Sequence, residues 1–282
     1  MTDSQLDYFT DLEAIVTLAL AEDIGDGDIT AQLIPVDQTA TAVVITRESA
    51  IVCGRPWFDE VFRQLDSSVQ IEWLTGEGQQ VEPNEELVKL AGNTRSLLTG
   101  ERTALNFLQT LMGTATTANT YAKLVEGTNT KVLDTRKTLP GLRRAQKYAV
   151  KIGGCDNHRL GLYDAFLIKE NHIAACGSIK AAVKNASGLS PGKLVEIEVE
   201  SIEELQQALT SNADIIMLDN FDREMMAEAI KLKTGTAKYE VSGNVDAEKL
   251  KRLPKNAIDY ISSGALTKHC TSIDLTMRAD PN

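Results

Sequence analysis

A regular alternation of short apolar runs and amphipathic segments in the second half of the chain restricts the fold more than any other feature. Each apolar run ends in polar residues, and most are followed by a segment with helical periodicity. This pattern is typical of a parallel sheet, and its six or seven repeats favour a TIM-like α/β barrel over an open sheet. Seven strands would leave such a barrel incomplete. The expected strands cover residues 131–135, 165–169, 194–200, 214–219, 238–243, 259–264 and 272–277, and the expected helices cover residues 141–152, 178–186, 201–209, 222–232 and 246–253.

The first part of the chain follows a different pattern. A helix is expected over residues 11–23, and it ends at the Gly-rich sequence IGDGD. Four β-rich runs follow, with one helix between the second and the third, which indicates a small α+β unit. A long helix is then expected from Arg95 to Glu126, with an interruption at Gly113. The β-rich runs cover residues 41–46, 50–54, 69–74 and 86–91, and the helix between them covers residues 56–65.

Charge and composition exclude several functions. The chain of 282 residues carries a net charge of −11, which argues against binding to nucleic acid or to anionic lipid. No apolar run approaches the roughly 20 residues that a bilayer requires, and the acidic N-terminus lacks the basic residues of a secretory signal. We therefore expect a cytoplasmic protein with no membrane partner. The four cysteines and three histidines form no CxxC or HxxxH pair, so neither a disulfide framework nor a zinc site is expected.

The residues that end the predicted strands form a chemically ordered set. In a barrel these ends point to one rim, where barrel enzymes place their sites. The early strands end in cations, the middle strands in carboxylates, and the late strands in small residues with accessible backbone amides. The candidate site residues at this rim are Thr135, Arg136, Lys137, Lys169, Glu198, Asp219, Ser242, Gly243, Asn244, Ser263, Gly264 and Ala265.

Basic residues are concentrated at the start of the predicted barrel. From residue 131 to residue 169 the chain has nine basic residues and three acidic ones. Such a cluster suits a multiply anionic small molecule, because several fixed cations can pair with its carboxylates or phosphates. Arg136, Lys137 and Lys169 are the stronger candidates because they end apolar strands. A solvated helix face is the more common explanation for Arg143, Arg144, Lys147 and Lys151.

Lys169 directly follows an apolar strand, so its side chain leaves a buried position. This position suits anion binding. It also suits a structural ion pair with Glu170 or Asp219. A third possibility is a Schiff base with a carbonyl substrate, as in aldolases.

Carboxylates alternate with apolar residues along the strand 194–200. Period-two alternation places Glu196, Glu198 and Glu200 on one face. If this face points inward, these groups and Asp219 suit magnesium held together with a pyrophosphate, or hydrogen bonds to ribose hydroxyls. A solvent-exposed outer face is the alternative, and it applies most to Glu196 and Glu200.

Ser-Gly sequences follow two late strands, at Ser242 and Ser263. Ser-Gly is commonly just a turn. However, loops after the last strands are the usual phosphate sites of such barrels, and glycine lets backbone amides approach an oxyanion closely. We therefore favour phosphate binding for both loops.

Three further residues, His158, Arg159 and Arg102, are candidates for anion binding. His158 alone is more often a hydrogen-bonded structural histidine than a catalyst, but its neighbour Arg159 favours a binding role. Arg102 lies on the apolar stripe of the long helix, between Leu98 and Leu105. Its stem either covers apolar surface at an edge, or its guanidinium reaches an anion in a neighbouring site, which implies a partner surface.

Several motifs in the chain resemble those of the quinolinate phosphoribosyltransferases, also called carboxylating nicotinate-nucleotide pyrophosphorylases. The most specific are DTRKTLPGLR, DNHRLGLYD and IKENH, and the resemblance extends from LAEDIGDGDIT to SSGALT. It implies an N-terminal α/β sandwich followed by an incomplete, seven-stranded α/β barrel. We place the sandwich domain at residues 1–112 and the barrel domain at residues 113–269. The tail, residues 270–282, is free to pack on the first domain.

The resemblance also implies an activity. Phosphoribosyl pyrophosphate and quinolinate would give nicotinate mononucleotide, pyrophosphate and carbon dioxide, a step of de novo NAD biosynthesis. It implies a homodimer or a multiple of one, with Arg102 supplied by the adjacent subunit, and Glu198 and Asp219 near ribose and magnesium. Asn244 stands where the family pattern has a second glycine in the phosphate loop. The residues that match the family's dicarboxylate and pyrophosphate ligands are Arg102, Arg136, Lys137, His158, Arg159 and Lys169.

Three alternatives belong to other functional classes or substrates. A related phosphoribosyltransferase would act on another anionic base. An aldolase would use Lys169 as a Schiff-base nucleophile. A barrel that only binds a metabolite would show binding without turnover, but the complete set of polar strand ends makes this the least favoured.

Overall fold

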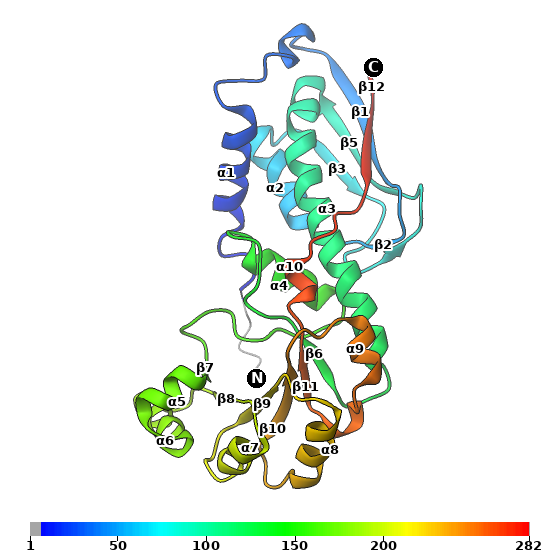
Figure 1. The fold of residues 1–282 in the computed structure, drawn as a ribbon. Coiled ribbons are helices and arrows are strands. Elements are labelled where there is room, and N and C mark those ends of the chain that lie inside the picture. The colour runs from blue at the N-terminus through cyan, green and yellow to red at the C-terminus, as the bar shows by residue number, and fades with distance from the viewer. Residues whose placement is uncertain (1–6, 282) are drawn as a thin grey trace. The chain divides into compact units, whose positions relative to one another are not determined.

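The computed structural model describes residues 7–281, which form two compact units (Figure 1). The antiparallel unit contains residues 7–119, 139–154 and 269–281, and the barrel unit contains residues 120–138 and 155–268. Helix α3 (Thr94–Val125) contributes to both. The predicted domain boundary near residue 113 falls inside this helix and stays a prediction. No helix within residues 7–281 is both long and apolar enough to cross a membrane.

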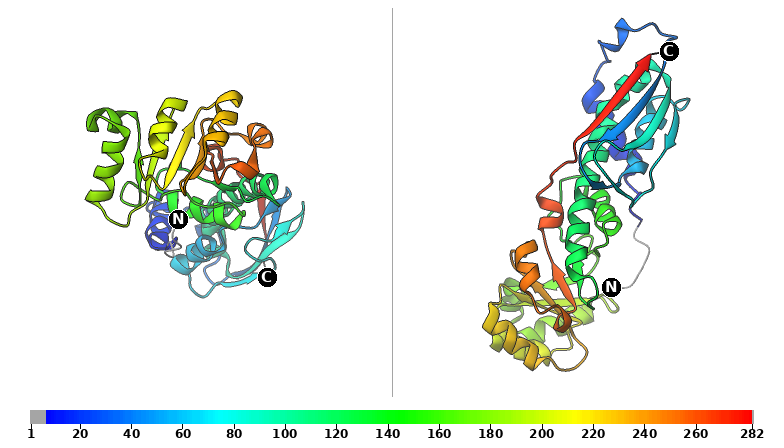
Figure 2. Two further views of the ribbon diagram at one scale, coloured as in Figure 1. Left: turned by 90° about the horizontal axis from the view of Figure 1, so that it is seen from below. Right: turned by 90° about the vertical axis from the view of Figure 1, so that its right-hand side faces the viewer.

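The antiparallel unit is built on a four-stranded sheet in the order β12-β1-β5-β3. Val44 lies at its centre, paired with Met277 on one side and Val88 on the other. Figure 2 shows β12, in red, running beside β1, in blue. A small second sheet joins β2 and β4. The strands are β1 (Thr39–Thr46), β2 (Ala50–Ile51), β3 (Gln70–Trp73), β4 (Gln80–Val81), β5 (Glu86–Asn93) and β12 (Leu275–Pro281).

Helices supply most of the large side chains in the core of this unit. They are α1 (Leu12–Ile24), a short 3-10 helix (Ala31–Leu33), α2 (Arg55–Leu65), the first part of α3, and α4 (Arg143–Ile152). Trp57, Phe58 and Phe62 of α2 meet Leu105 and Leu108 of α3, and each is at most 1% exposed. Burial of such side chains stabilises the fold by roughly 1.5–3 kcal/mol each.

The barrel unit is built on a six-stranded parallel sheet in the order β6-β11-β10-β9-β8-β7. Every residue of β8 is buried, as expected for a sheet covered on both faces. Helices α6 to α8 lie along one side of the sheet (Figure 1). The strands are β6 (Lys131–Leu133), β7 (Phe166–Ile168), β8 (Val195–Val199), β9 (Ile215–Asp219), β10 (Lys238–Ser242) and β11 (Tyr260–Ser262).

Side-chain caps start four of the barrel helices. Ser178, Ser201, Asp222 and Asp246 each accept a hydrogen bond from a backbone amide in the first turn of the helix that follows. Such caps contribute typically about 1 kcal/mol and fix where a loop becomes a helix. The helices are α5 (Glu170–Cys176), α6 (Ile179–Leu189), α7 (Ile202–Leu209), α8 (Arg223–Leu232), α9 (Ala247–Arg252), a 3-10 helix (Lys255–Ala257) and α10 (Ala265–Lys268).

The structure corrects two expectations. The run 272–277 does not join the parallel sheet, because its residues from Leu275 onward pair antiparallel with β1. A seventh barrel position is instead marked by a single parallel bridge between Leu133 and Asp156. Helix α3 is not interrupted at Gly113. This glycine has a packing role, since a Cβ there would overlap the Thr271 carbonyl.

Candidate active site

The strand ends of the barrel unit bring together the loops that follow β6 and β11. Lys137 and Thr135 lie against Gly264, where an added Cβ would stand 3.0 Å from Lys137 Cδ and 3.5 Å from Thr135 Oγ1. The Thr267 hydroxyl donates to the Lys137 carbonyl at 2.8 Å, and the Lys137 amide donates to Thr135 Oγ1 at 3.1 Å. A predicted cation and a predicted phosphate loop are therefore neighbours at this rim.

Two arginines of the rim lie within electrostatic reach of each other. Burial lowers the pKa of Arg159, and the nearby positive charge of Arg136 lowers it further. The Arg159 Nη1 group donates to the Ala165 carbonyl at 3.0 Å, which fixes one end of the guanidinium. Because like charges repel, an anion bound between the two arginines would stabilise both. This arrangement suits a ligand with more than one carboxylate.

Lys169 and Glu198 form a close ion pair with Nζ and Oε2 2.5 Å apart. Lys169 therefore pairs with neither of the partners considered from the sequence. Glu198 is 8% exposed, and burial raises the pKa of its carboxyl, with Lys169 opposing this and Asp219 adding to it. Cation, carboxylate and the end of β9 thus meet at one place. Oxygens of Glu170, Glu198 and Glu200 also lie within 4.8 Å of one another.

The structure shows which of the three glutamates on or after β8 are buried. Glu196 is buried like Glu198, so the exposed alternative is wrong for Glu196. Glu200 lies beyond the end of the strand and is exposed.

The loop after β10 has a geometry that depends on glycine and asparagine. Gly243 has a φ of +99°, and a Cβ there would lie 2.8 Å from Asn220 Cγ and 2.9 Å from the Asn220 backbone nitrogen. Asn220 and Asn244 adopt left-handed conformations with φ of 54° and 46°, which asparagine tolerates better than most residues. Asn244 can therefore occupy the position of the second glycine. Asn220 Nδ2 also donates to Asp219 Oδ2 at 2.8 Å.

The loop after β11 is held by its serine. The Ser263 hydroxyl donates to the Val245 carbonyl, and the Ala265 amide donates to Ser263 Oγ at 3.3 Å. Ser263 is buried while Gly264 and Ala265 are partly exposed. The serine thus ties the two late loops together, and its partly exposed neighbours are the accessible part of this loop.

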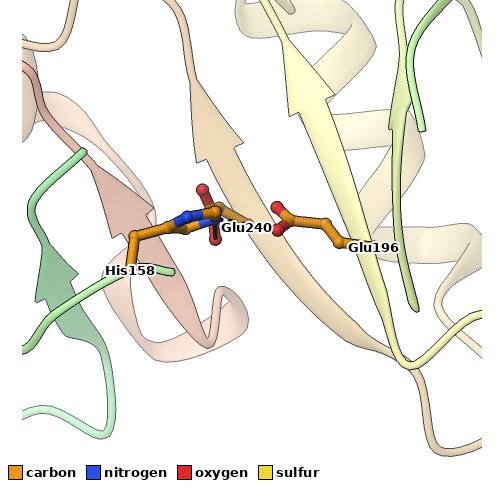
Figure 3. A group of neighbouring side chains, drawn as sticks. All are labelled: His158, Glu196 and Glu240. Carbon is orange, nitrogen blue, oxygen red and sulfur yellow. Dashed lines mark hydrogen bonds and ion pairs between the residues drawn. The ribbon is translucent and has the colours of Figure 1, made fainter. Parts of the chain in front are cut away.

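His158 is buried among carboxylates of the barrel interior (Figure 3). Its Nε2 lies 2.8 Å from Glu196 Oε2 and 3.6 Å from Glu240 Oε2. Its backbone amide donates to Asp134 Oδ1 at 2.9 Å. The histidine is thus hydrogen-bonded, as expected for a structural residue, and it directly precedes Arg159.

Arg102 belongs to the antiparallel unit and is exposed. Leu98, one turn earlier on α3, is also exposed at 37%. The apolar segment that contains the exposed Ile29, Leu33 and Val36 is tied to the start of this helix, because Asp28 accepts from Thr99 and the Ile34 carbonyl accepts from Arg95. The four helix cations of residues 143–151 belong to this unit as well. Lys147 is completely buried, so the solvated helix face expected for it is wrong.

Asp134, a polar residue at the end of the first barrel strand, accepts hydrogen bonds from the Asn157 side chain and the His158 amide. Sequence reasoning missed two other residues of the barrel unit. Lys249 donates to the Gly243 carbonyl at 2.5 Å. Glu240 is completely buried. The period-two pattern of β10 could have identified Glu240 as inward, but nothing in the sequence marks Lys249.

The fold and this rim define a class: a barrel enzyme whose strand ends gather cations, carboxylates and glycine loops around polyanionic small molecules. Comparison with known families makes the assignment narrower. Models of the N-terminal and C-terminal domains of quinolinate phosphoribosyl transferase match residues 28–112 and 114–278. The chain therefore belongs to the quinolinate phosphoribosyltransferase family.

Relatives and solved structures agree with this membership. A probable carboxylating nicotinate-nucleotide pyrophosphorylase of Synechocystis sp. is 41% identical, covering 92% of this chain and 89% of the relative. A probable carboxylating nicotinate-nucleotide pyrophosphorylase of Bacillus subtilis is 38% identical, covering 94% of this chain and 92% of the relative. The nicotinate-nucleotide pyrophosphorylase structure from Francisella tularensis has a TM-score of 0.91 at 49% identity, covering 95% and 96%. NadC from Streptococcus pyogenes has a TM-score of 0.93 at 36% identity, covering all of both chains.

Proposed function

We propose that this chain transfers the phosphoribosyl group of phosphoribosyl pyrophosphate to quinolinate, with decarboxylation, and that the barrel rim is its active site. The products are nicotinate mononucleotide, pyrophosphate and carbon dioxide, as in de novo NAD biosynthesis. Family membership supports the reaction. The observation that carries the site assignment is the proximity of Arg136 and Arg159, two cations from different loops of one rim.

Quinolinate carries two adjacent carboxylates, and the two arginines supply a matching pair of charges. Arg136 and Arg159 would hold one carboxylate each, and Lys169, directly after β7, adds a third cation to the rim. A site built for two anions is left with an unpaired cation when a monocarboxylate binds. The arrangement therefore favours quinolinate over nicotinate.

Phosphoribosyl pyrophosphate requires a cation for its pyrophosphate and amides for its phosphate. Lys137 beside Gly264 fits the first role. The loops of Ser242, Gly243 and Asn244 and of Ser263, Gly264 and Ala265 fit the second, because residues in positive-φ or turn conformations can direct several amides at one oxyanion.

Magnesium fits the carboxylates of the same rim. Glu198 and Asp219 are hard oxygen donors near each other, and Glu170 and Glu200 have oxygens close to those of Glu198. Magnesium prefers such ligands and usually shares them with substrate phosphates. When bound, it would neutralise charge on the pyrophosphate.

The reaction needs charge placement more than a nucleophile on the protein. As the bond from ribose carbon one to pyrophosphate breaks, Lys137 and Lys169 offset the charge that develops on the leaving group. The pyridine nitrogen then bonds to that carbon. Loss of carbon dioxide from the adjacent ring position leaves an electron pair that the cationic ring stabilises, and a proton from solvent completes the product.

A homodimer in which Arg102 serves the partner's site fits the antiparallel unit. Arg102 and Leu98 are exposed one turn apart on α3, and the segment with the exposed Ile29 and Leu33 is hydrogen-bonded to the start of the same helix. Apolar side chains gathered on one surface favour a protein contact, and a cation at its edge is placed to reach an anion across it. Formation of a homodimer or a multiple of one is part of this proposal.

A cytoplasmic location is also part of the proposal. The four cysteines form no disulfide in the structure, which is usual in reducing compartments.

Incubation of the protein with quinolinate, phosphoribosyl pyrophosphate and magnesium tests the function directly. We expect nicotinate mononucleotide and carbon dioxide in equal amounts, and no product from nicotinate. Product from nicotinate but not from quinolinate would favour a related phosphoribosyltransferase that acts on another anionic base. Borohydride trapping tests the aldolase. An attacking amine must be uncharged, whereas Lys169 is paired with Glu198, so we expect no trapped adduct.

A further inference from the structure

The barrel interior contains a buried trio of one histidine and two glutamates, His158, Glu196 and Glu240 (Figure 3). Glu196 comes from β8 and Glu240 from β10, and the loop before Arg159 supplies the histidine. His158 is 6% exposed, Glu196 is 3% exposed and Glu240 is 0% exposed. Candidate ligand atoms of all three lie within 4.8 Å of one another. The roles proposed above for substrate and magnesium use neither glutamate.

The hydrogen bonds of the trio fix which atom of the ring carries a proton. Nε2 of His158 faces Glu196 Oε2 at 2.8 Å and Glu240 Oε2 at 3.6 Å. Carboxylate oxygens accept hydrogen bonds, so Nε2 is the donor. Glu196 takes the short bond, and Glu240 is the more distant neighbour.

Two buried carboxylates this close repel each other when both are ionised. Burial raises the pKa of Glu240 to about 8, and the negative charge of Glu196 contributes to this shift. Oε1 of Glu196 has no hydrogen-bond partner among the described residues, and the groups that face Glu240 are His158, Glu196 and Ser262.

We propose that Glu196 and Glu240 form a buried anchor that holds the His158 ring and, through it, positions Arg159 for the dicarboxylate. This rests on the proposed function of Arg159. Glu196 makes the short hydrogen bond to the ring, and Glu240 is its more distant partner. Both are positioning residues, because they act through His158 and touch no substrate.

The surroundings of His158 connect the anchor to Arg159. Asp134 accepts from the Asn157 side chain at 2.8 Å and from the His158 amide at 2.9 Å, so the loop is fixed just before the arginine. Arg159 is held on its other side by the Ala165 carbonyl. Burial and Arg136 lower the pKa of Arg159, and the charge of Glu196 opposes this by favouring the charged guanidinium. Release of the ring would leave the guanidinium held from one side only.

Two isosteric variants distinguish the roles of the glutamates. Glu196→Gln changes the group that makes the short bond to His158, and we expect KM for quinolinate to rise about tenfold or more while KM for phosphoribosyl pyrophosphate stays within about twofold. Glu240→Gln changes only the more distant partner, so its effect on KM for quinolinate should be several times smaller. Glu228→Gln on the exposed surface of α8 is the control for a charge change and should not alter either KM. Equal effects of the two buried variants, or a larger effect of Glu240→Gln, would overturn the proposal.

Nitrogen-15 spectra of the histidine rings test the anchor independently of activity and of any variant that fails to fold. The chain has three histidines, and the signals of His158 are those that remain when the exposed His172 and His269 are replaced by glutamine. We expect a proton on Nε2 that exchanges slowly with water. A bare Nε2 would contradict the anchor, and so would one metal ion per chain that survives dialysis against a chelator and remains bound to the trio. If the wild-type protein makes no nicotinate mononucleotide, the proposed function fails, while this spectrum still decides on the anchor.

Discussion

Replacement of Gly243 by alanine tests whether the loop after β10 must approach Asn220 closely. The new Cβ would lie 2.8 Å from Asn220 Cγ and 2.9 Å from the Asn220 backbone nitrogen, and it would overlap Oδ1 of the same residue. Ordinary carbon contacts need about 3.5 Å or more. The loop or the end of β9 must therefore shift by somewhat under 1 Å, and this shift would displace Asp219, which Asn220 contacts.

A displacement of this size in a substrate-binding loop costs about 100-fold in rate, which corresponds to about 2.7 kcal/mol of transition-state stabilisation. We expect Gly243→Ala to lower kcat/KM for phosphoribosyl pyrophosphate by that order. Gly235→Ala is the matched control, because Gly235 also has a positive φ, of +75°, but a Cβ there would meet nothing within 4 Å. Both variants should lose roughly 1–2 kcal/mol of stability through backbone strain. Steady-state kinetics with urea unfolding of both proteins measures the difference, and equal kcat/KM in the two variants would refute the reasoning.

Four further predictions follow from the same contacts. Arg136→Ala should lower kcat/KM for quinolinate by about 100-fold with little change in melting temperature, and near-normal activity would count against the site. Glu198→Gln should raise the magnesium concentration needed for half-maximal activity by about tenfold or more, and an unchanged magnesium requirement would remove Glu198 from the metal site. Inactive Arg102→Ala and inactive Lys169→Ala chains should regain activity when mixed under conditions of proven subunit exchange, whereas no recovery would exclude a shared site. The pKa of Glu240 is raised in the folded state from an ordinary 4.5 to about 8, with His158, Glu196 and Ser262 facing it, so the folded state binds a proton that the unfolded state has lost. The free energy of unfolding should therefore fall as pH rises between these two values, and Glu240→Gln should gain stability relative to wild type over that range. Urea unfolding at several pH values measures this. A difference in unfolding free energy between variant and wild type that does not change with pH would contradict it.

Much of the fold could be predicted because local patterns and tertiary structure agree. Period-two alternation in β8 and helix caps such as Ser201 and Asp222 mark the strand and helix boundaries of the barrel. The edge strand β12 could not be placed in the same way. Its alternation looks the same in either sheet, and only pairing with β1, far away in sequence, decides its position.

The candidate site was predictable to a similar extent. Residues that directly follow strands, such as Arg136 and Lys169, were found because strand ends share one rim. The contacts between them were not, since the sequence gives no distance between Lys169 and Glu198. Glu240 was missed because a carboxylate inside a strand is usually taken as solvent-exposed. Here it is buried together with a neighbouring carboxylate and a histidine.

A double-mutant cycle on Arg136 and Arg159 tests most directly whether these two cations hold one dicarboxylate. Groups that bind the same ligand depend on each other, so the combined loss in kcat/KM for quinolinate should differ from the sum of the single losses by about 1 kcal/mol or more. The same cycle measured for phosphoribosyl pyrophosphate should show a smaller coupling. Strictly additive effects of Arg136→Ala and Arg159→Ala on quinolinate would show that the two arginines act apart, and would contradict the proposed site.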